Sequence, residues 1–304
     1  MTIPAHSPYD GSSRPFAIGL KPLALADWIE VDENLVAHLA EKRRLYAGMP
    51  QEVFVEEPET RAAQQEVLDL LTAHLPERFP QTYRRADDGI ELLGERPAPP
   101  PGLDAPLVAA SLLVQEDLIL MRRGDDGWRL AAGSLCFPSS WTLTEKFGKP
   151  LHAIHVPVPG FGPGSRPDEL IARMFDGLQG QAMERFNWSI QAGDALYHPL
   201  SNLQRDDRAA SRPSHFADDG AIDAGAFIRV ERQTLRKLPV SRDVLFTIRI
   251  HLDPLAVLAR HPDRARLAAS FAHQLMALDT AQLDYKGLTA DRDRLVAWLH
   301  AAAA

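Results

Sequence analysis

The sequence has very little cysteine, because Cys136 is the only one in 304 residues. A single thiol cannot form an intramolecular disulfide, and this scarcity is typical of proteins in a reducing compartment. Iron–sulfur clusters usually need about four thiolates, so this chain cannot hold one alone. If the protein needs electrons, they have to come from another protein.

Long apolar runs and clusters of basic residues are also missing. No stretch of about 18 consecutive apolar residues occurs, and the first residues show no basic start followed by an apolar core. The net charge is −8, with no Lys/Arg stripe of the kind that binds nucleic acids or anionic membranes. We therefore expect a cytoplasmic protein whose partners are small molecules or other proteins.

Several common catalytic motifs are absent as well. The sequence contains no GxGxxG, GxxxxGK[ST], GxSxG or HExxH motif. These absences count against a Rossmann cofactor site, a P-loop NTPase, an α/β-hydrolase and a zincin. Cys136 lies in an apolar run, where a thiol usually serves as packing.

The N-terminal third indicates an extended arm followed by helices. Residues 1–24 are rich in Pro, Gly and Ser, whereas apolar residues recur at helical spacing from Trp28 to Tyr46 and from Thr60 to His74. Residues 95–106 contain five prolines, which neither a helix nor a central strand accommodates. We interpret this segment as a linker into a different kind of structure.

After this linker the pattern changes to short apolar runs separated by turns. We expect antiparallel strands over residues 107–114, 117–123 and 128–137. The capping-box spacing of Thr142 and Glu145 predicts a short helix, which Gly148 and Pro150 end. Two further elements are expected in this section, an extended segment over residues 151–161 and a helix over residues 167–178.

Two later segments alternate between apolar and polar residues, as strands do. They are FIRVERQ, residues 227–233, and VLFTIRIHL, residues 244–252, and two helices are expected after residue 254. The order predicts an α+β fold, with an antiparallel sheet of about five strands interrupted by short helices and flanked by helices at both ends. We divide the chain into an arm with helices (1–104), a core (105–256) and C-terminal helices (257–304).

His152 and His155 are candidate metal ligands. They are three residues apart, and if the prolines at 157 and 159 keep the backbone extended, the two side chains face opposite ways. One imidazole on a rigid segment is still enough for an axial haem ligand. The ordinary alternative is a hydrogen-bonded histidine without a metal.

The polar faces of the two late strands form a second candidate site. If the strands are neighbours, Arg229 and Glu231 lie close to Thr247, Arg249 and His251. The ordinary explanation is a solvated face with cross-strand ion pairs. In a pocket, the arginines could instead bind carboxylates and Glu231 could hold a cationic substrate.

The segment RFNWSI, residues 185–190, allows two interpretations. Trp188 can be core and Asn187 can satisfy a turn, or both can lie beside a ligand. Four strings then occur in one order between residues 107 and 256: SLCFPSSWTLTEKFGKPLHAIHVPVPGF, RFNWSI, RVERQTLRKLP and VLFTIRIHLDPL. Together they resemble the haem-dependent oxidative N-demethylase family, represented by the haem subunit of dimethylamine oxidative demethylase.

This resemblance implies a PAS-like core that binds haem b. It also implies oxidation of a small secondary amine by O₂ to a primary amine and formaldehyde, with NADPH, FMN and an iron–sulfur cluster on partner subunits only. His155 occupies the histidine of the IHVPVPG block, which implies the axial iron ligand, with His152 as second choice. The implied cofactor-binding or pocket residues are Arg229, Glu231, Arg232, Gln233, Arg249, Asn187 and Trp188, of which Glu231 and Arg229 are the expected catalytic residues.

Other functions are open at this level. The same pocket could belong to a haem-based sensor or binding protein without turnover, or the fold could be a structural protein that has lost its haem. If neither His155 nor His152 binds iron, His198 and His251 are the next candidates.

Overall fold

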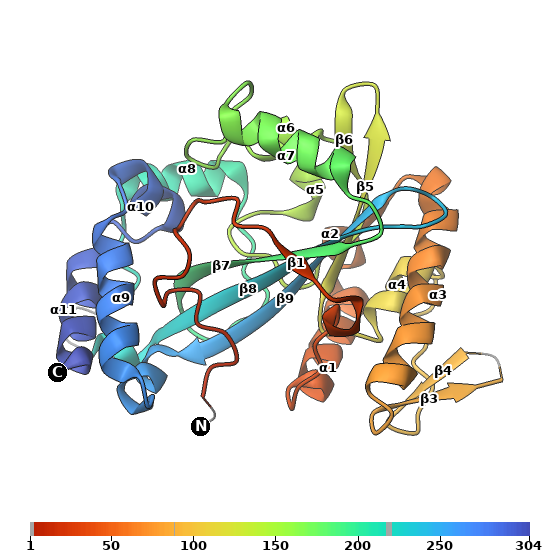
Figure 1. Ribbon diagram of the computed structural model, residues 1–304, viewed down its shortest axis with the longest axis horizontal. Helices are drawn as coiled ribbons and strands as arrows, with labels where there is room; N and C mark the ends of the chain where they lie inside the picture. The colour runs from red at the N-terminus through yellow and green to blue at the C-terminus, as the bar shows by residue number, and fades with distance from the viewer. Residues whose placement is uncertain (1–2, 88, 217–220) are drawn as a thin grey trace.

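The computed structural model describes residues 3–87, 89–216 and 221–304. These residues form an antiparallel sheet in the order β1, β7, β8, β9, β5, β6, β2, and a separate hairpin of β3 and β4. Helices lie at both ends of the large sheet, which confirms the expected α+β class (Figure 1). The strands are β1 (Lys21–Leu23), β2 (Phe54–Glu56), β3 (Tyr83–Ala86), β4 (Gly89–Leu92), β5 (Asp117–Gly124), β6 (Gly127–Ser134), β7 (Ala182–Ala192), β8 (Ala226–Lys237) and β9 (Val244–Pro254).

The large sheet has seven strands, not about five, and two predictions in its core are wrong. Residues 107–114 do not form a strand, because helix α4 (Pro106–Ser111) begins at Pro106. Most α4 side chains are buried, so its sequence is apolar on nearly all sides and shows no helical period. Strand β7 was not expected, because Glu184, Arg185 and Asn187 interrupt the apolar pattern.

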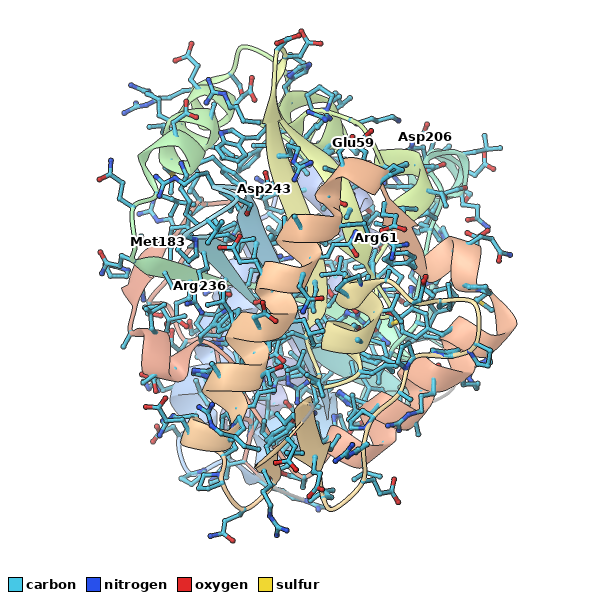
Figure 2. The ribbon with its side chains drawn as sticks, turned by 90° about the vertical axis from the view of Figure 1, so that its right-hand side faces the viewer. Glu59, Arg61, Met183, Asp206, Arg236 and Asp243 are labelled. Carbon is cyan, nitrogen blue, oxygen red and sulfur yellow. The ribbon has the colours of Figure 1, made fainter. Side chains whose placement is uncertain are left out.

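One face of the sheet is covered by helices from both ends of the chain. Helices α1 (Leu35–Gly48), α3 (Arg61–Arg78) and α4 pack on β5, β6 and β9. Helix α3 confirms the helix expected over Thr60–His74, whereas α1 begins later than the expected Trp28. Figure 2 looks onto α3, with Arg236 of β8 and Asp243 labelled beside it. Three short elements complete this part: η1 (Leu25–Asp27), α2 (Pro50–Val53) and η2 (Pro58–Thr60).

The C-terminal helices cover the same face over β7 and β8. Trp188, Ile190, Ile228 and Val230 pack there against the helices after β9. The described residues contain three α-helices after β9 rather than the expected two, because the segment breaks at Gly287. They are α9 (Arg264–Met276), α10 (Thr280–Lys286) and α11 (Arg292–Ala303), with the 3₁₀ turns η3 (Ile222–Ala224) before β8 and η4 (Leu255–Arg260) after β9. No helix in the described part of the chain is both long and apolar enough to cross a membrane.

Short helices from the middle of the chain lie over the opposite face. They are α5 (Leu143–Lys146), α6 (Leu151–Ile154) and α7 (Arg166–Gly177), with α8 (Asn202–Ser211) beside them (Figure 1). The predicted short helix and the predicted helix over residues 167–178 are confirmed as α5 and α7. The capping box does not form, because the carboxylate of Glu145 accepts the backbone N–H of Asn202 instead.

The N-terminal arm contacts both faces of the sheet. Tyr9 is buried among the C-terminal helices, whereas Phe16 and Ile18 pack against the core on the other face. Strand β1 then pairs with β7 and forms an edge of the sheet. The arm therefore passes around the β7 edge and helps to enclose what lies on the far side.

Candidate functional site

A cavity lies between the sheet and the short middle helices. Its volume is about 290 Å³. Its floor is formed by strands β5 to β9, and its other walls come from α6, α7, α8, α10 and the N-terminal arm. The apolar part of the lining consists of Phe16, Ile18, Leu20, Ile119, Met121, Leu130, Trp141, Leu151, Ile154, Val158, Phe161, Ile171, Phe175, Ile190, Ala192, Leu235, Phe246 and Ile248.

His155 lies on the wall of this cavity, whereas His152 is not among its lining residues. The prediction of an extended segment over residues 151–161 is wrong at its beginning. Pro150 starts a single helical turn, and the N–H of His155 donates to the carbonyl of Leu151 at 3.0 Å. Pro157 and Pro159 act only after this turn, so the two histidines are separated by a helical turn rather than by strand alternation.

The environment of His155 favours a neutral imidazole. Burial, together with the cations of Lys146 and Arg185, lowers the pKa of His155 to about 4. At neutral pH the ring therefore has a free nitrogen lone pair, which is the form that binds a metal. No hydrogen bond to this ring is found among the described residues, and its nearest aromatic neighbour is Phe161, with ring centroids 6.2 Å apart.

Glu231 contributes the only carboxylate among the described lining residues. It projects from β8, where it is paired with Asn187 of β7. The side-chain amides of Gln233 and Asn187 donate to its Oε2 atom at 2.8 and 3.4 Å, and no described group donates to Oε1. One oxygen of this carboxylate is thus held in place while the other can accept a hydrogen bond from a ligand.

Basic side chains outnumber this single acid in the cavity. Burial lowers the pKa of Lys146 to about 7 and that of Lys286 to about 8, and it also lowers the pKa of Arg185. The Nε atom of Arg185 is buried without a hydrogen-bond partner, as is that of Arg208. Such a wall favours a ligand with carboxylate groups.

The sequence did not predict these basic residues. Arg185 opens the RFNWSI motif and could have been noticed, because in a strand it would share a face with Asn187, two residues later. Arg208 and Lys286 lie in polar helices distant in sequence, and nothing in their local sequence distinguishes them from surface residues.

The predicted shared polar face of the two late strands does not exist. Strands β8 and β9 are neighbours, but Glu231 is opposite Ile250 and Arg232 is opposite Arg249. Glu231 therefore shares its face with the apolar residues of β9, while Arg249 faces the terminal helices. The correct register depends on the turn between the strands, which side-chain alternation does not reveal.

Three of the other predicted site residues lie away from the cavity. Arg249 donates to Asp32 at 2.5 Å, and Arg232 donates to Glu184 at 3.0 Å. The indole N–H of Trp188 donates to Gln274 at 2.9 Å within the C-terminal core, which matches its ordinary interpretation. The structure brings together His155, Glu231, Asn187 and Gln233, and it adds His198 from the reserve candidates.

Arg229 is buried behind the wall of the cavity rather than in it. Its guanidinium donates to the backbone carbonyls of Phe137, Pro138 and Leu196 and to the side chain of Gln191. These carbonyls belong to two loops that a parallel bridge between Ser139 and His198 joins, and both of these residues line the cavity. Arg229 thus holds the loops in position.

The comparison with known families agrees with this geometry. Residues 19–296 match the family described as "Haem-dependent oxidative N-demethylase, alpha subunit-like". The match covers the sheet, the short middle helices and most of the terminal helices, including every residue of the cavity except Phe16 and Ile18. The chain therefore belongs to the haem-dependent oxidative N-demethylase alpha subunit-like family.

Proposed function

We propose that this protein binds haem b and oxidatively demethylates a small secondary amine of the dimethylamine kind. The amine, O₂, two electrons and two protons would give a primary amine, formaldehyde and water. The observation that carries the proposal is the neutral imidazole of His155 on the wall of the cavity. Among the described lining residues of the same cavity, Glu231 provides the single carboxylate. Membership of the family supports haem dependence and oxidoreductase chemistry.

The residues of the cavity fit an iron porphyrin. His155 offers a neutral nitrogen for the iron, and the apolar lining suits the macrocycle. Arg185, Arg208 and Lys286 suit the two propionates, because their positive charges are only partly balanced by Glu231. When bound, the haem would supply the activation of O₂ and the oxidation of the methyl group.

The haem would be held without covalent bonds to the chain. Attachment through thioethers uses cysteines next to the axial histidine, and the only cysteine here is Cys136. Burial raises the pKa of this thiol to about 12, so it stays protonated inside the core. The electrons would come through a partner protein that carries FMN and an iron–sulfur cluster and oxidises NADPH, since one cysteine cannot hold a cluster.

Glu231 would bind and orient the amine. A secondary amine is protonated at neutral pH, and the free Oε1 of Glu231 can accept a charge-assisted hydrogen bond from its N–H. Transfer of that proton to Oε1 would leave a neutral amine. Asn187 and Gln233 keep the carboxylate pointing into the cavity through Oε2.

We also propose that the core is PAS-like. Counted along the chain, the five long strands of the sheet are β5, β6, β7, β8 and β9. Within the sheet they lie side by side in the order β6, β5, β9, β8, β7, so the second strand of the five is followed by the first, fifth, fourth and third. This antiparallel order, with short helices over one face, supports the PAS-like assignment.

The proposal is tested by comparing His155→Ala with His152→Ala after expression with ample haem. We expect the wild type and His152→Ala to show a Soret band with one haem per chain, and His155→Ala to lose most of it. Formaldehyde release from dimethylamine, with a suitable reductant, then tests turnover. A haem-loaded wild type that binds amine without releasing formaldehyde would favour a sensor, and equal haem in both variants would exclude His155 as the ligand.

The amine site is tested separately with Glu231→Gln. We expect a higher KM for dimethylamine with haem content unchanged, because the neutral amide keeps the shape but loses the charge-assisted bond. An unchanged KM would show that Glu231 does not contact the amine.

A further inference from the structure

A second cluster of metal-binding side chains lies on the opposite face of the sheet from the cavity. The Nε2 atom of His6 is 2.8 Å from Glu30 Oε1, and the Nε2 atom of His251 is 3.0 Å from Glu30 Oε2. One donor atom from each residue lies within 4.8 Å of the other two. The three residues come from the N-terminal arm, the segment before α1 and strand β9, so only the fold brings them together.

We propose that His6, Glu30 and His251 bind one zinc ion. Zinc favours imidazole and carboxylate ligands, and sites with two histidines, one glutamate and a water are an established arrangement. Ligand atoms about 2 Å from a tetrahedral zinc ion are roughly 3.3 Å apart. This is slightly more than the 2.8 and 3.0 Å between each imidazole Nε2 atom and Glu30, and it is below the 4.8 Å within which all three donor atoms lie. Small side-chain rotations would therefore create the site without backbone movement.

Arg232 and Arg249 are cations close to this cluster, and both have other partners. Arg249 lies two residues before His251 on β9 and is paired with Asp32. The Nε atom of Arg232 is 3.3 Å from Glu30 Oε1 but only 3.0 Å from Glu184 Oε2. Its remaining N–H groups donate to the carbonyls of Trp28 and Asp27 at 3.2 and 2.6 Å. Glu184 can balance the charge of Arg232, which leaves the carboxylate of Glu30 for zinc.

Both rings already turn the nitrogen that zinc would use toward Glu30. The atom of His6 and of His251 that approaches the carboxylate is Nε2 in each case. On binding, each ring would keep its proton on Nδ1 and offer Nε2 to the metal.

Zinc at this position would fasten the beginning of the N-terminal arm to the sheet. Three residues after His6, Tyr9 stacks on Phe271 with ring centroids 4.5 Å apart. Further along, Phe16 and Ile18 line the cavity on the other face. The ion would therefore stabilise a segment that encloses the cavity, although zinc binding itself does not depend on the proposed function.

The experiment counts metal in the purified full-length protein. The wild type, His6→Ala and the control His273→Ala are stripped with a chelator and dialysed against buffered zinc. Zinc is then measured by mass spectrometry, with haem iron counted separately. His273 is a suitable control because it is exposed on α9 and distant in sequence from the cluster.

We expect one zinc per chain in the wild type and in His273→Ala. His6→Ala should bind zinc more than about 100-fold more weakly, because losing a ligand costs more than the roughly 10- to 100-fold loss caused by removing an outer partner. Zinc should also raise the Tm of the wild type but not that of His6→Ala.

Two results would overturn the proposal. One is a wild type that holds no zinc under these conditions, and the other is His6→Ala with the zinc content of the wild type. Zinc-edge X-ray absorption of the loaded wild type gives an independent readout. It should show two imidazoles and an oxygen ligand, and a spectrum without imidazole would place the ion elsewhere.

Discussion

Replacement of Arg229 by Met tests how the wall of the cavity is held. Arg229 is fully buried, and its guanidinium donates at 2.7 Å to the carbonyl of Phe137 and at 3.2 Å to that of Leu196 and to the side chain of Gln191. Methionine fills a similar volume but donates no hydrogen bonds. The carbonyl of Pro138 keeps a donor, because it also accepts the N–H of His198 at 3.2 Å.

The magnitude follows from the acceptors that lose their donor. The buried carbonyl of Phe137 costs about 1–3 kcal/mol when it is left unsatisfied. The half-buried carbonyl of Leu196 and the side-chain oxygen of Gln191, which is buried but belongs to a rotatable side chain, cost about 0.5–1.5 kcal/mol each, the usual net value of a hydrogen bond. Removing the buried charge recovers part of this loss, so we expect Arg229→Met to lower the free energy of unfolding by about 3 kcal/mol.

Urea unfolding followed by circular dichroism measures this loss. The matched control is Arg236→Met on the same strand, at the position labelled in Figure 2. The guanidinium carbon of Arg236 lies 4.3 Å from the ring centroid of Trp28, a contact worth about 1 kcal/mol. If Arg229→Met costs no more than Arg236→Met, the hydrogen bonds to the loops do not hold the wall.

Two further predictions concern the cavity and its surroundings. Because burial lowers the pKa of His155 from 6.5 to about 4, the folded haem-free chain binds fewer protons than the unfolded chain between these values. The free energy of unfolding should therefore rise with pH across this window by up to about 3 kcal/mol, and His155→Ala should flatten the rise in urea titrations; equal slopes would contradict the shift. Gly287→Ala should lower the free energy of unfolding by about 1–2 kcal/mol, because Gly287 has φ +68° and its Cβ would lie 3.0 Å from Arg208. The control Gly48→Ala, with open space around its Cβ, should cost nothing, and equal effects in thermal melts would refute this reasoning.

The sequence was sufficient where local patterns determine structure. Helical spacing predicted α3 and α7, and strict alternation predicted β8 and β9. It failed for α4, which is too thoroughly buried to show a period, and for β7, where polar side chains face the cavity instead of solvent. In both cases the pattern of apolar and polar residues reflects what surrounds the element in the folded protein, so the local sequence alone does not reveal the type of element.

The candidate site was predictable only in part. His155 and Glu231 lie within recognisable motifs, and the structure places both on one cavity. Arg232 and Arg249 lie in the same motifs yet face the other side of the sheet, because one position along a strand reverses the direction of a side chain. Lys286 reaches the cavity from a helix about 50 residues after β8, a contact that only the tertiary fold creates.

The cavity also shows why the division of the chain at residues 105 and 256 does not describe a self-sufficient site. The middle section contains His155 and Glu231, but Phe16 and Lys286 close the cavity from outside it. Both edge strands of the sheet, β1 and β2, also come from the N-terminal part. A section without these segments would expose the apolar lining and remove part of the positive charge that suits propionates. The terminal segments are therefore part of the site itself, and the family match from residue 19 to residue 296 includes most of them, Lys286 among them, although Phe16 lies before it.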